Sequence, residues 1–416
     1  MKWALEPAER SLALLMVFAA LLAVYAWASV GSTLFAPGLI GFDYNAPGTD
    51  WMVMYAASDA SLSGHLPIIF DGDRFTAHLN ELFAHTLRHP LEFRPWVYPP
   101  SFLLLLAPFS ILGFVGSYLG FQAVSGGLMT AALLHRPDHR AASLWIAVAA
   151  LLSPAASINV IDGQCGFLVA ALLIGAVRMM SVRPIVAGVL LGLLSFKPQF
   201  AVLAPVAFLA AGQWRALAAA AATVAGLVIL SALVFGAEAW IAWFKEMHEV
   251  AAGTNPKWVQ LGRLWGDSVF ACAVLAGFPA IVANALQAAA LILGAGVVAL
   301  AFRSRLSTDV KLAVLLAAVI LAAPHSASYD KVLLVVAAGL WLAAQPRPWP
   351  TWAGILVLGL WLSAMIGPPI VMPLGRLLPV LVLGFLVAAL RTPEVTEVLS
   401  TTWRALDPRA RRPARG

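Results

Sequence analysis

Long apolar runs separated by short polar interruptions make up most of the chain between residues 11 and 390. The first run, SLALLMVFAALLAVYAWASV, covers residues 11–30, and later runs include FLVAALLIGAV, ALILGAGVVALAF and LLPVLVLGFLVAAL. About 20 consecutive apolar residues cross the hydrocarbon core of a bilayer as an α-helix. The pattern therefore predicts an all-α protein, a polytopic bundle of membrane-spanning helices.

Composition agrees with this pattern and excludes an ordinary soluble protein. The chain of 416 residues is 61% hydrophobic and 11% charged, whereas soluble domains are about 25% charged. The formal net charge of +6 comes from Lys and Arg in short clusters between the apolar runs, which is typical of membrane-protein loops rather than of a nucleic-acid-binding surface. The two cysteines, Cys165 and Cys272, show no metal-ligand spacing and predict no disulfide framework.

The longest polar interval, residues 41–100, directly follows the first apolar run. It carries five aspartates and four histidines, and the histidines are irregularly spaced with no pairing typical of metal ligands. A long loop is uncommon in a compact domain and is usually functional. We therefore predict that a large first loop, residues 36–100, carries the chemistry of the protein.

The distribution of Lys and Arg predicts which loops face the cytoplasm. Lys2 and Arg10 place the N-terminus inside. The run that follows is longer than the roughly 7–15 residues of a signal-peptide core, so we expect a retained first span with an extracytoplasmic loop after it.

Later clusters of Arg and Lys set the number of crossings. HRPDHR, RMMSVR, GQWR and RSRLSTDVK all fall inside when one crossing lies between residues 100 and 135 and one between residues 267 and 303. The total is then roughly twelve spans with both termini cytoplasmic. We predict one membrane domain over residues 1–391, with outer loops at 36–100 and 236–267, and a basic cytoplasmic tail at 392–416.

This topology places acidic, amide, histidine, lysine and tyrosine side chains together on the outer face. A polar or ionisable residue at the edge of an apolar span is a candidate functional residue. The outer loops contain Asp43, Asp50, Tyr98, Asn159, Asp162, Gln164, Lys197, Gln199, His325, Tyr329, Asp330 and Lys331.

Simpler roles are open for several of these residues. Aspartate is favoured at helix N-caps, so Asp50 is a candidate N-cap of a helix beginning at Trp51. Asn159 and Asp162 are placed to cap the following span, and Lys197 is placed to extend its ammonium group to lipid headgroups.

Five segments, taken in order, resemble a known family. They are TDWMVMYAAS, VYPPSFLLLLAPFSILG, INVIDGQCGFLVAALL, GLLSFKPQF and PHSASYDKVLL. Together they resemble glycosyltransferase family 87, the bacterial DUF2029 group, whose best-known members are periplasmic mannosyltransferases that use polyprenyl-phosphate mannose. The resemblance implies a GT-C fold, a membrane helical bundle with an acidic residue in its first extracytoplasmic loop. The matching position is Asp50.

Transfer from a lipid-linked sugar phosphate needs a carboxylate to take the proton of the acceptor hydroxyl. It also needs cationic or hydrogen-bonding groups to stabilise the departing phosphate. The expected general base is Asp50, and direct displacement predicts inversion at the anomeric carbon. Candidates for the donor phosphate are Lys197, His325 and Lys331. Candidates for the sugar or the acceptor are Asp43, Tyr55, Tyr98, Asn159, Gln164, Gln199, Tyr329 and Asp330. No cofactor is expected, and the chemistry requires no divalent metal.

These expectations describe an integral membrane hexosyltransferase, in the first place a mannosyltransferase, with a polyprenyl-phosphate sugar as donor. The acceptor is a glycolipid, a glycan or a protein, the other partners are membrane lipids, and no nucleic acid is expected. The expected location is the bacterial inner (plasma) membrane, with the active site facing the periplasm or the cell exterior.

A multi-span transporter or flippase of lipids or solutes is the alternative function. It would need ionisable groups near the bilayer midplane and usually an internal inverted repeat. Here the polar residues lie at the ends of the apolar runs, and no clear repeat is visible. A structural membrane subunit without activity is a third alternative.

Overall fold

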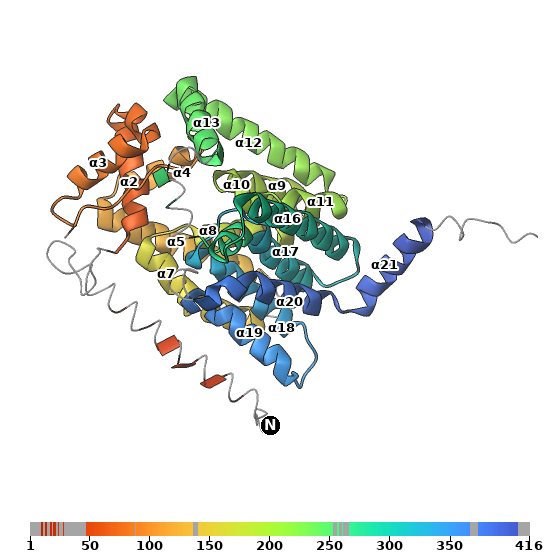
Figure 1. Ribbon diagram of the computed structural model, residues 1–416. Helices are drawn as coiled ribbons and strands as arrows, with labels where there is room; N and C mark the ends of the chain where they lie inside the picture. Colours follow the sequence, from red (N-terminus) through yellow and green to blue (C-terminus); the bar gives the residue numbers. More distant parts are fainter. Residues whose placement is uncertain are drawn as a thin grey trace, which may run out of the picture.

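The computed structural model describes residues 47–87, 89–135, 140–252, 266–366 and 373–406, together with scattered positions between 10 and 28 and residues 256, 257 and 260. Within this part of the chain every regular element is an α-helix or a short 3₁₀-helix (Figure 1). The predicted all-α class is therefore confirmed. Most of the predicted first span, Asp43 and the end of the basic tail lie outside the described residues.

The helices follow one another in three groups along the chain. The first group is α2 (Thr49–Leu62), η2 (Leu66–Phe70), α3 (Gly72–Leu82), α4 (Ser101–Ser110), α5 (Phe114–Leu134), α6 (Arg140–Leu151) and α7 (Pro154–Asp162). The second is α8 (Gly166–Met179), α9 (Pro184–Leu193), η4 (Leu194–Phe196), α10 (Pro198–Ala201), α11 (Ala204–Ala210), α12 (Trp214–Phe235), α13 (Ala237–Ala252) and α15 (Val269–Leu275). The third is α16 (Ala280–Arg303), α17 (Thr308–Ala322), η5 (Ser328–Lys331), α18 (Val332–Ala343), α19 (Thr351–Leu362), η6 (Ser363–Ile366), η7 (Pro373–Leu377), α20 (Leu378–Leu390) and α21 (Pro393–Leu406).

The interval after the first apolar run is folded mainly as helices rather than as an open polar loop. α2, η2 and α3 occupy much of it, and Ile69, Phe75 and Leu79 are fully buried within it. Asp71 caps α3 by accepting a hydrogen bond from the backbone N–H of Arg74 at 3.1 Å. Apolar residues at helical spacing, set between the aspartates and histidines, join this segment to the hydrophobic core of the molecule.

α17 and α18 form the centre of the molecule. Nearly every residue of both helices is buried, and the two pack against each other and against α8. Helices that are apolar all round are expected in such a central position. The short connection between them, residues 323–331, is thereby held at one end of the core.

Two described helices are long and apolar enough to cross a membrane alone, α12 with 22 residues and α16 with 24. Three helix pairs are both long and apolar enough only when taken together, and each pair is bent, by 115° at α4–α5, by 55° at α6–α7 and by 85° where α20 meets α21. α4 is about 15 Å long, too short to cross the hydrocarbon core of about 30 Å by itself. This agrees with a single crossing between residues 100 and 135, while the total of roughly twelve spans stays a prediction.

α9 and α12 pack with their backbones close together. Gly188 and Gly192 are four residues apart in α9 and face α12, where an added Cβ would clash with the Ala216 carbonyl or with Thr223. Small residues at this spacing allow membrane helices to approach closely. The seam therefore depends on the absence of side chains at two positions.

Candidate functional site

Polar side chains from five separate segments meet at one end of the helical core. The segments are α2, the stretch before α4, the α7–α8 turn, the η4–α10 turn and η5. Hydrogen bonds join their side chains into one network. The structure thus brings together five residues that the sequence placed on a common face: Asp50, Tyr98, Gln164, Lys197 and Asp330.

Asp50 lies in the first turn of α2 and is half-buried. The N-cap position belongs to Gly48, whose φ of 78° is left-handed, and no side chain caps the helix, so the alternative that Asp50 is the N-cap is wrong. The Oδ2 atom of Asp50 accepts a hydrogen bond from the Nε2 of Gln164 at 2.7 Å. Its Oδ1 has no hydrogen-bond partner in the described part of the chain.

The side-chain amide of Gln164 is the centre of the network. Its Oε1 accepts hydrogen bonds from the Tyr98 hydroxyl at 3.3 Å, the Cys165 backbone N–H at 3.3 Å and the Lys197 Nζ at 3.5 Å. Three donors around Oε1 identify the oxygen end of the amide, so the NH₂ end must face Asp50. Gln164 and Tyr98 are each 6% exposed, which shields these bonds from water.

A second buried amide, Gln122 of α5, supports this arrangement. Its Nε2 donates to the backbone carbonyl of Gln164 at 3.0 Å, and its Oε1 accepts from the Nδ2 of Asn159 at 2.9 Å. The hydrophobic pattern does not single out Gln122 as a site residue, although the sequence contains one signal. It is the only amide or charged side chain in the apolar α5 segment FVGSYLGFQAVSGGLMTAALL.

Asn159 is fully buried in α7, with both ends of its amide bonded to protein. Its Oδ1 accepts the backbone N–H of Gly166 at 2.7 Å, and this residue begins α8. The alternative that Asn159 caps the following helix is therefore confirmed. The N-cap position of α8 belongs to Cys165, whose own side chain makes no capping bond, so the Asn159 side chain takes this role from the preceding helix.

Two buried ion pairs lie beside the network. The Nζ of Lys197 is 3.3 Å from Asp330, and the Nζ of Lys331 is 2.9 Å from Asp267. Lys331 also donates to the Ser363 carbonyl at 3.1 Å. The alternative that Lys197 extends to lipid headgroups is wrong, because its ammonium group is buried against a carboxylate. Burial raises the pKa of Asp267, and the Lys331 ammonium opposes that rise only in part.

His325 and Tyr329 lie in the connection between α17 and α18. Surrounding protein desolvates the His325 imidazole and lowers its pKa below 6.5, an effect that the Asp330 charge opposes. The His325 side chain is nevertheless accessible to solvent. The Nζ of Lys197 lies 5.2 Å from the centre of the Tyr329 ring.

The remaining predicted residues are less closely joined to the network. Tyr55 packs its ring against Phe83 and Phe114, at centroid distances of 6.2 and 5.7 Å. Gln199 is half-buried in α10, two residues after Lys197. Asp43 lies outside the described residues.

One further carboxyl group, Asp162, interacts electrostatically with Asp50 and with Arg94. These acids do not form a metal site in the described ranges, where no group of three or more His, Cys, Asp or Glu side chains is arranged to hold a metal ion. The charged groups at this end of the core are therefore arranged as pairs and hydrogen bonds.

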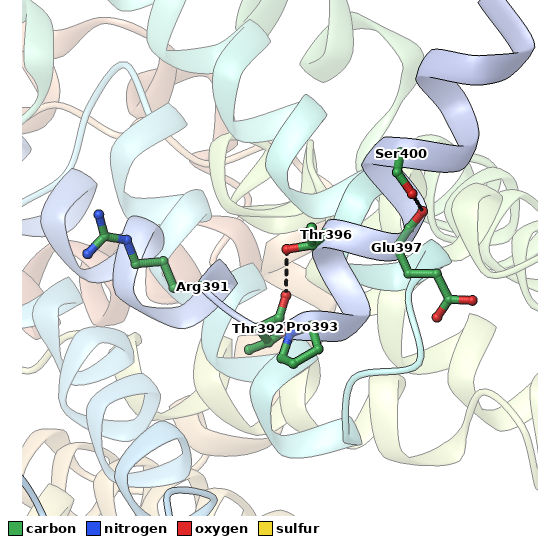
Figure 2. A pocket seen from close by; sticks show the side chains of 6 residues that line it. All are labelled: Arg391, Thr392, Pro393, Thr396, Glu397 and Ser400. Atoms are coloured by element: carbon green, nitrogen blue, oxygen red, sulfur yellow. Dashed lines mark hydrogen bonds between the residues drawn. The ribbon is translucent and has the colours of Figure 1, made fainter.

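A surface pocket of about 570 Å³ lies elsewhere, where α20 meets α21 (Figure 2). It is lined by Arg391, Thr392, Pro393, Thr396, Glu397 and Ser400. The hydroxyls of Thr396 and Ser400 are bonded to helix carbonyls at 3.1 and 2.8 Å. None of the predicted site residues contributes to this pocket.

The middle of the chain matches a family model. Residues 96–324, more than half of the chain, match glycosyltransferase family 87. The chain belongs to glycosyltransferase family 87. No curated protein and no solved structure gives a match. The predicted resemblance to family 87 is therefore confirmed, and three of the five segments, VYPPSFLLLLAPFSILG, INVIDGQCGFLVAALL and GLLSFKPQF, lie within the matched range.

Membership of family 87 makes the protein a glycosyltransferase, and its apolar helices make it a membrane protein. α12 exposes Leu233 by 78% and Val234 by 58%, an apolar surface suited to lipid. The matched residues include Tyr98, Gln164 and Lys197, whereas Asp50 and Asp330 lie outside the matched range. Their place in the site rests on the contacts described above.

Proposed function

We propose that this family 87 glycosyltransferase moves a hexosyl group from a polyprenyl-phosphate sugar to an acceptor hydroxyl, with Asp50 as the general base. One observation carries the proposal. Oδ2 of the half-buried Asp50 is held by Gln164, while Oδ1 has no described protein partner. A carboxylate held in this way has one oxygen available for a substrate proton.

In the proposed step the acceptor oxygen attacks the anomeric carbon as its proton passes to Oδ1 of Asp50. The bond between the anomeric carbon and the phosphate oxygen breaks, and its electron pair leaves with the polyprenyl phosphate. Attack from the face opposite the leaving group inverts the anomeric configuration.

Lys197 and Lys331 are the proposed partners of the departing phosphate. Each ammonium already faces a carboxylate, so each pair is close to neutral as a unit. A lysine has three N–H donors. Two of them face protein, Asp330 and Gln164 at Lys197 and Asp267 and Ser363 at Lys331, and the third can bond a phosphate oxygen as its charge grows. The accessible imidazole of His325 supplies a further N–H donor.

Sugar contacts are assigned first to the predicted residues that keep accessible side chains. Tyr329 and Gln199 are both partly exposed. Tyr98, Asn159 and Gln164 are buried with their polar atoms bonded to protein. We therefore assign these three to holding the site rather than to binding hydroxyl groups of the sugar.

The apolar helices support a donor with a lipid tail, because a polyprenyl chain can lie against their exposed faces. We further propose that the hexosyl group is mannosyl and that the acceptor is a glycolipid, a glycan or a protein. We also propose that the site faces the periplasm or the cell exterior. These three proposals follow from the family resemblance.

The test replaces Asp50 by asparagine and measures transfer from labelled polyprenyl-phosphate mannose and other hexose donors. Asn is similar in shape but cannot take the proton, so Asp50→Asn should lower turnover by at least about a hundredfold. Asp59→Asn is the matched control, since Asp59 lies in the same helix and makes no bond to Gln164. Near-normal turnover in Asp50→Asn would remove Asp50 as the base. Absence of transfer by the unaltered protein with every donor would remove the proposed function.

A further inference from the structure

Gln122 lies away from the reacting atoms but is bonded to the turn that carries Gln164. Its carbonyl and its NH₂ group each have a partner of the correct kind, at 2.9 Å from Asn159 and 3.0 Å from the Gln164 carbonyl. A side chain in the middle of an apolar helix is thus fully used in two hydrogen bonds. A polar side chain inside an apolar span is energetically costly, and such residues are therefore candidates for a functional role.

These bonds hold the α7–α8 turn at both ends. Asn159 binds the start of α8 through Gly166, and Gln122 binds both Asn159 and the backbone of Gln164. The turn itself needs Gly163, whose φ is 77° and which leaves no room for a Cβ beside Trp51. The direction of the Gln164 side chain therefore depends on the bonds from α5.

We propose that Gln122 is the positioning residue of the site: through the Gln164 turn it fixes which oxygen of Asp50 is free to accept the substrate proton. This inference rests on the proposed function of Asp50. A displaced Gln164 would leave both oxygens of Asp50 without a protein donor, and small misplacements of reacting groups are expensive in rate.

The chain supplies a matched control in a second buried glutamine. Gln287 of α16 is 8% exposed, accepts the backbone N–H of Phe270 at 3.0 Å and donates to the Ala322 carbonyl at 3.0 Å. It bridges helices as Gln122 does but makes no bond to Gln164 or Asp50. Gln122→Met and Gln287→Met therefore remove the same kind of bridge at two places.

The two native cysteines report locally on these two places without any assay of activity. Cys165 is fully buried next to Gln164, and Cys272 is 5% exposed in α15, the helix that Gln287 holds through Phe270. Each thiol should react slowly with N-ethylmaleimide in the unaltered protein. Loosening of one bridge should expose one thiol and leave the other protected.

The experiment uses the full-length protein in lipid nanodiscs. The initial rate of N-ethylmaleimide labelling at each cysteine is measured by peptide mass spectrometry, and kcat and the donor KM are measured on the same samples. Gln122→Met should speed labelling at Cys165 and lower kcat by about tenfold to a hundredfold, with the donor KM changed by less than about threefold. Gln287→Met should speed labelling at Cys272 and not at Cys165, and it should lower kcat less than Gln122→Met does, because Gln287 makes no bond to Gln164 or Asp50.

An unchanged Cys165 labelling rate in Gln122→Met, or a kcat equal to that of Gln287→Met, would overturn the inference. If Gln122→Met does not fold, Gln122→Asn takes its place, because the shorter amide cannot reach both partners. If Asp50→Asn remains active while Gln122→Met is slow, the proposed role of Asp50 fails, and with it the statement that Gln122 acts through Asp50. If the unaltered protein transfers no sugar, the proposed function fails, and the labelling rates alone decide whether Gln122 holds the turn.

Discussion

Lys197 and Asp330 form an ion pair whose side chains are 5% and 3% exposed. In such a place each charge depends on the other, because water cannot replace a lost partner. Removing one member of a buried pair costs about 3–5 kcal/mol, whereas replacing both members is often close to neutral. Replacing Lys197 and Asp330 together therefore separates the effect of Lys197 on stability from its effect on substrate binding.

Lys197→Met alone should lower the unfolding temperature, because it leaves the Asp330 charge unpaired. Lys197→Met combined with Asp330→Asn should recover most of that loss, as measured by thermal unfolding in detergent. If Lys197 bonds the donor phosphate, the double variant should still show a raised donor KM. A normal donor KM in the stable double variant would limit Lys197 to a structural role.

At this scale the sequence identified residues better than it identified their partners. Gln164 and Lys197 are predicted because each lies at the edge of an apolar run, and Asp50 is predicted because the family resemblance implies an acidic residue in the first outer loop. Gln122 was missed because it lies inside a span, where a single amide hardly changes the hydrophobic pattern. The pairing of Lys197 with Asp330 could not be predicted, since it depends on how distant helices pack.

The contact between α9 and α12 likewise depends on how helices pack, here over two whole helices. Gly188→Ala adds one methyl group against the Ala216 carbonyl, which belongs to a helix backbone and cannot rotate away. Overpacking of this kind costs about 1–3 kcal/mol. The change should lower the thermal unfolding temperature of the purified protein.

Gly226→Ala in α12 is the matched control, because nothing lies within 4 Å of the added methyl group. It should leave the unfolding temperature unchanged or raise it, as alanine favours helix over glycine by about 1 kcal/mol. Equal effects of the two substitutions would contradict the close packing of α9 on α12.

Helix type was predictable from the sequence, whereas helix boundaries were less so. The apolar runs predict the all-α class, but they do not show the bend of 55° where Pro154 begins α7. The predicted loop at residues 36–100 contains α2 and α3, and the charges of α3 mask the apolar spacing of its buried face. The bend and the buried face both depend on neighbouring helices.

For the whole molecule the orientation in the membrane is the main open prediction. The distribution of Lys and Arg predicts that Ser63 lies outside the cell and Ser400 inside. Both positions are exposed, and both native cysteines are buried. A cysteine at position 63, and not one at position 400, should react with a membrane-impermeant thiol reagent on intact cells. Labelling at 400 without labelling at 63 would reverse the topology.

The network also has a consequence for the order in which the protein is made. Lys197 and its partner Asp330 are separated by 133 positions, and Asp50 precedes both. A ribosome therefore completes Asp50, Gln164 and Lys197 long before it reaches Asp330. Until then the carboxylate that pairs with Lys197 in the folded protein has not been made, so the buried ion pair can form only after the chain has been extended beyond Asp330.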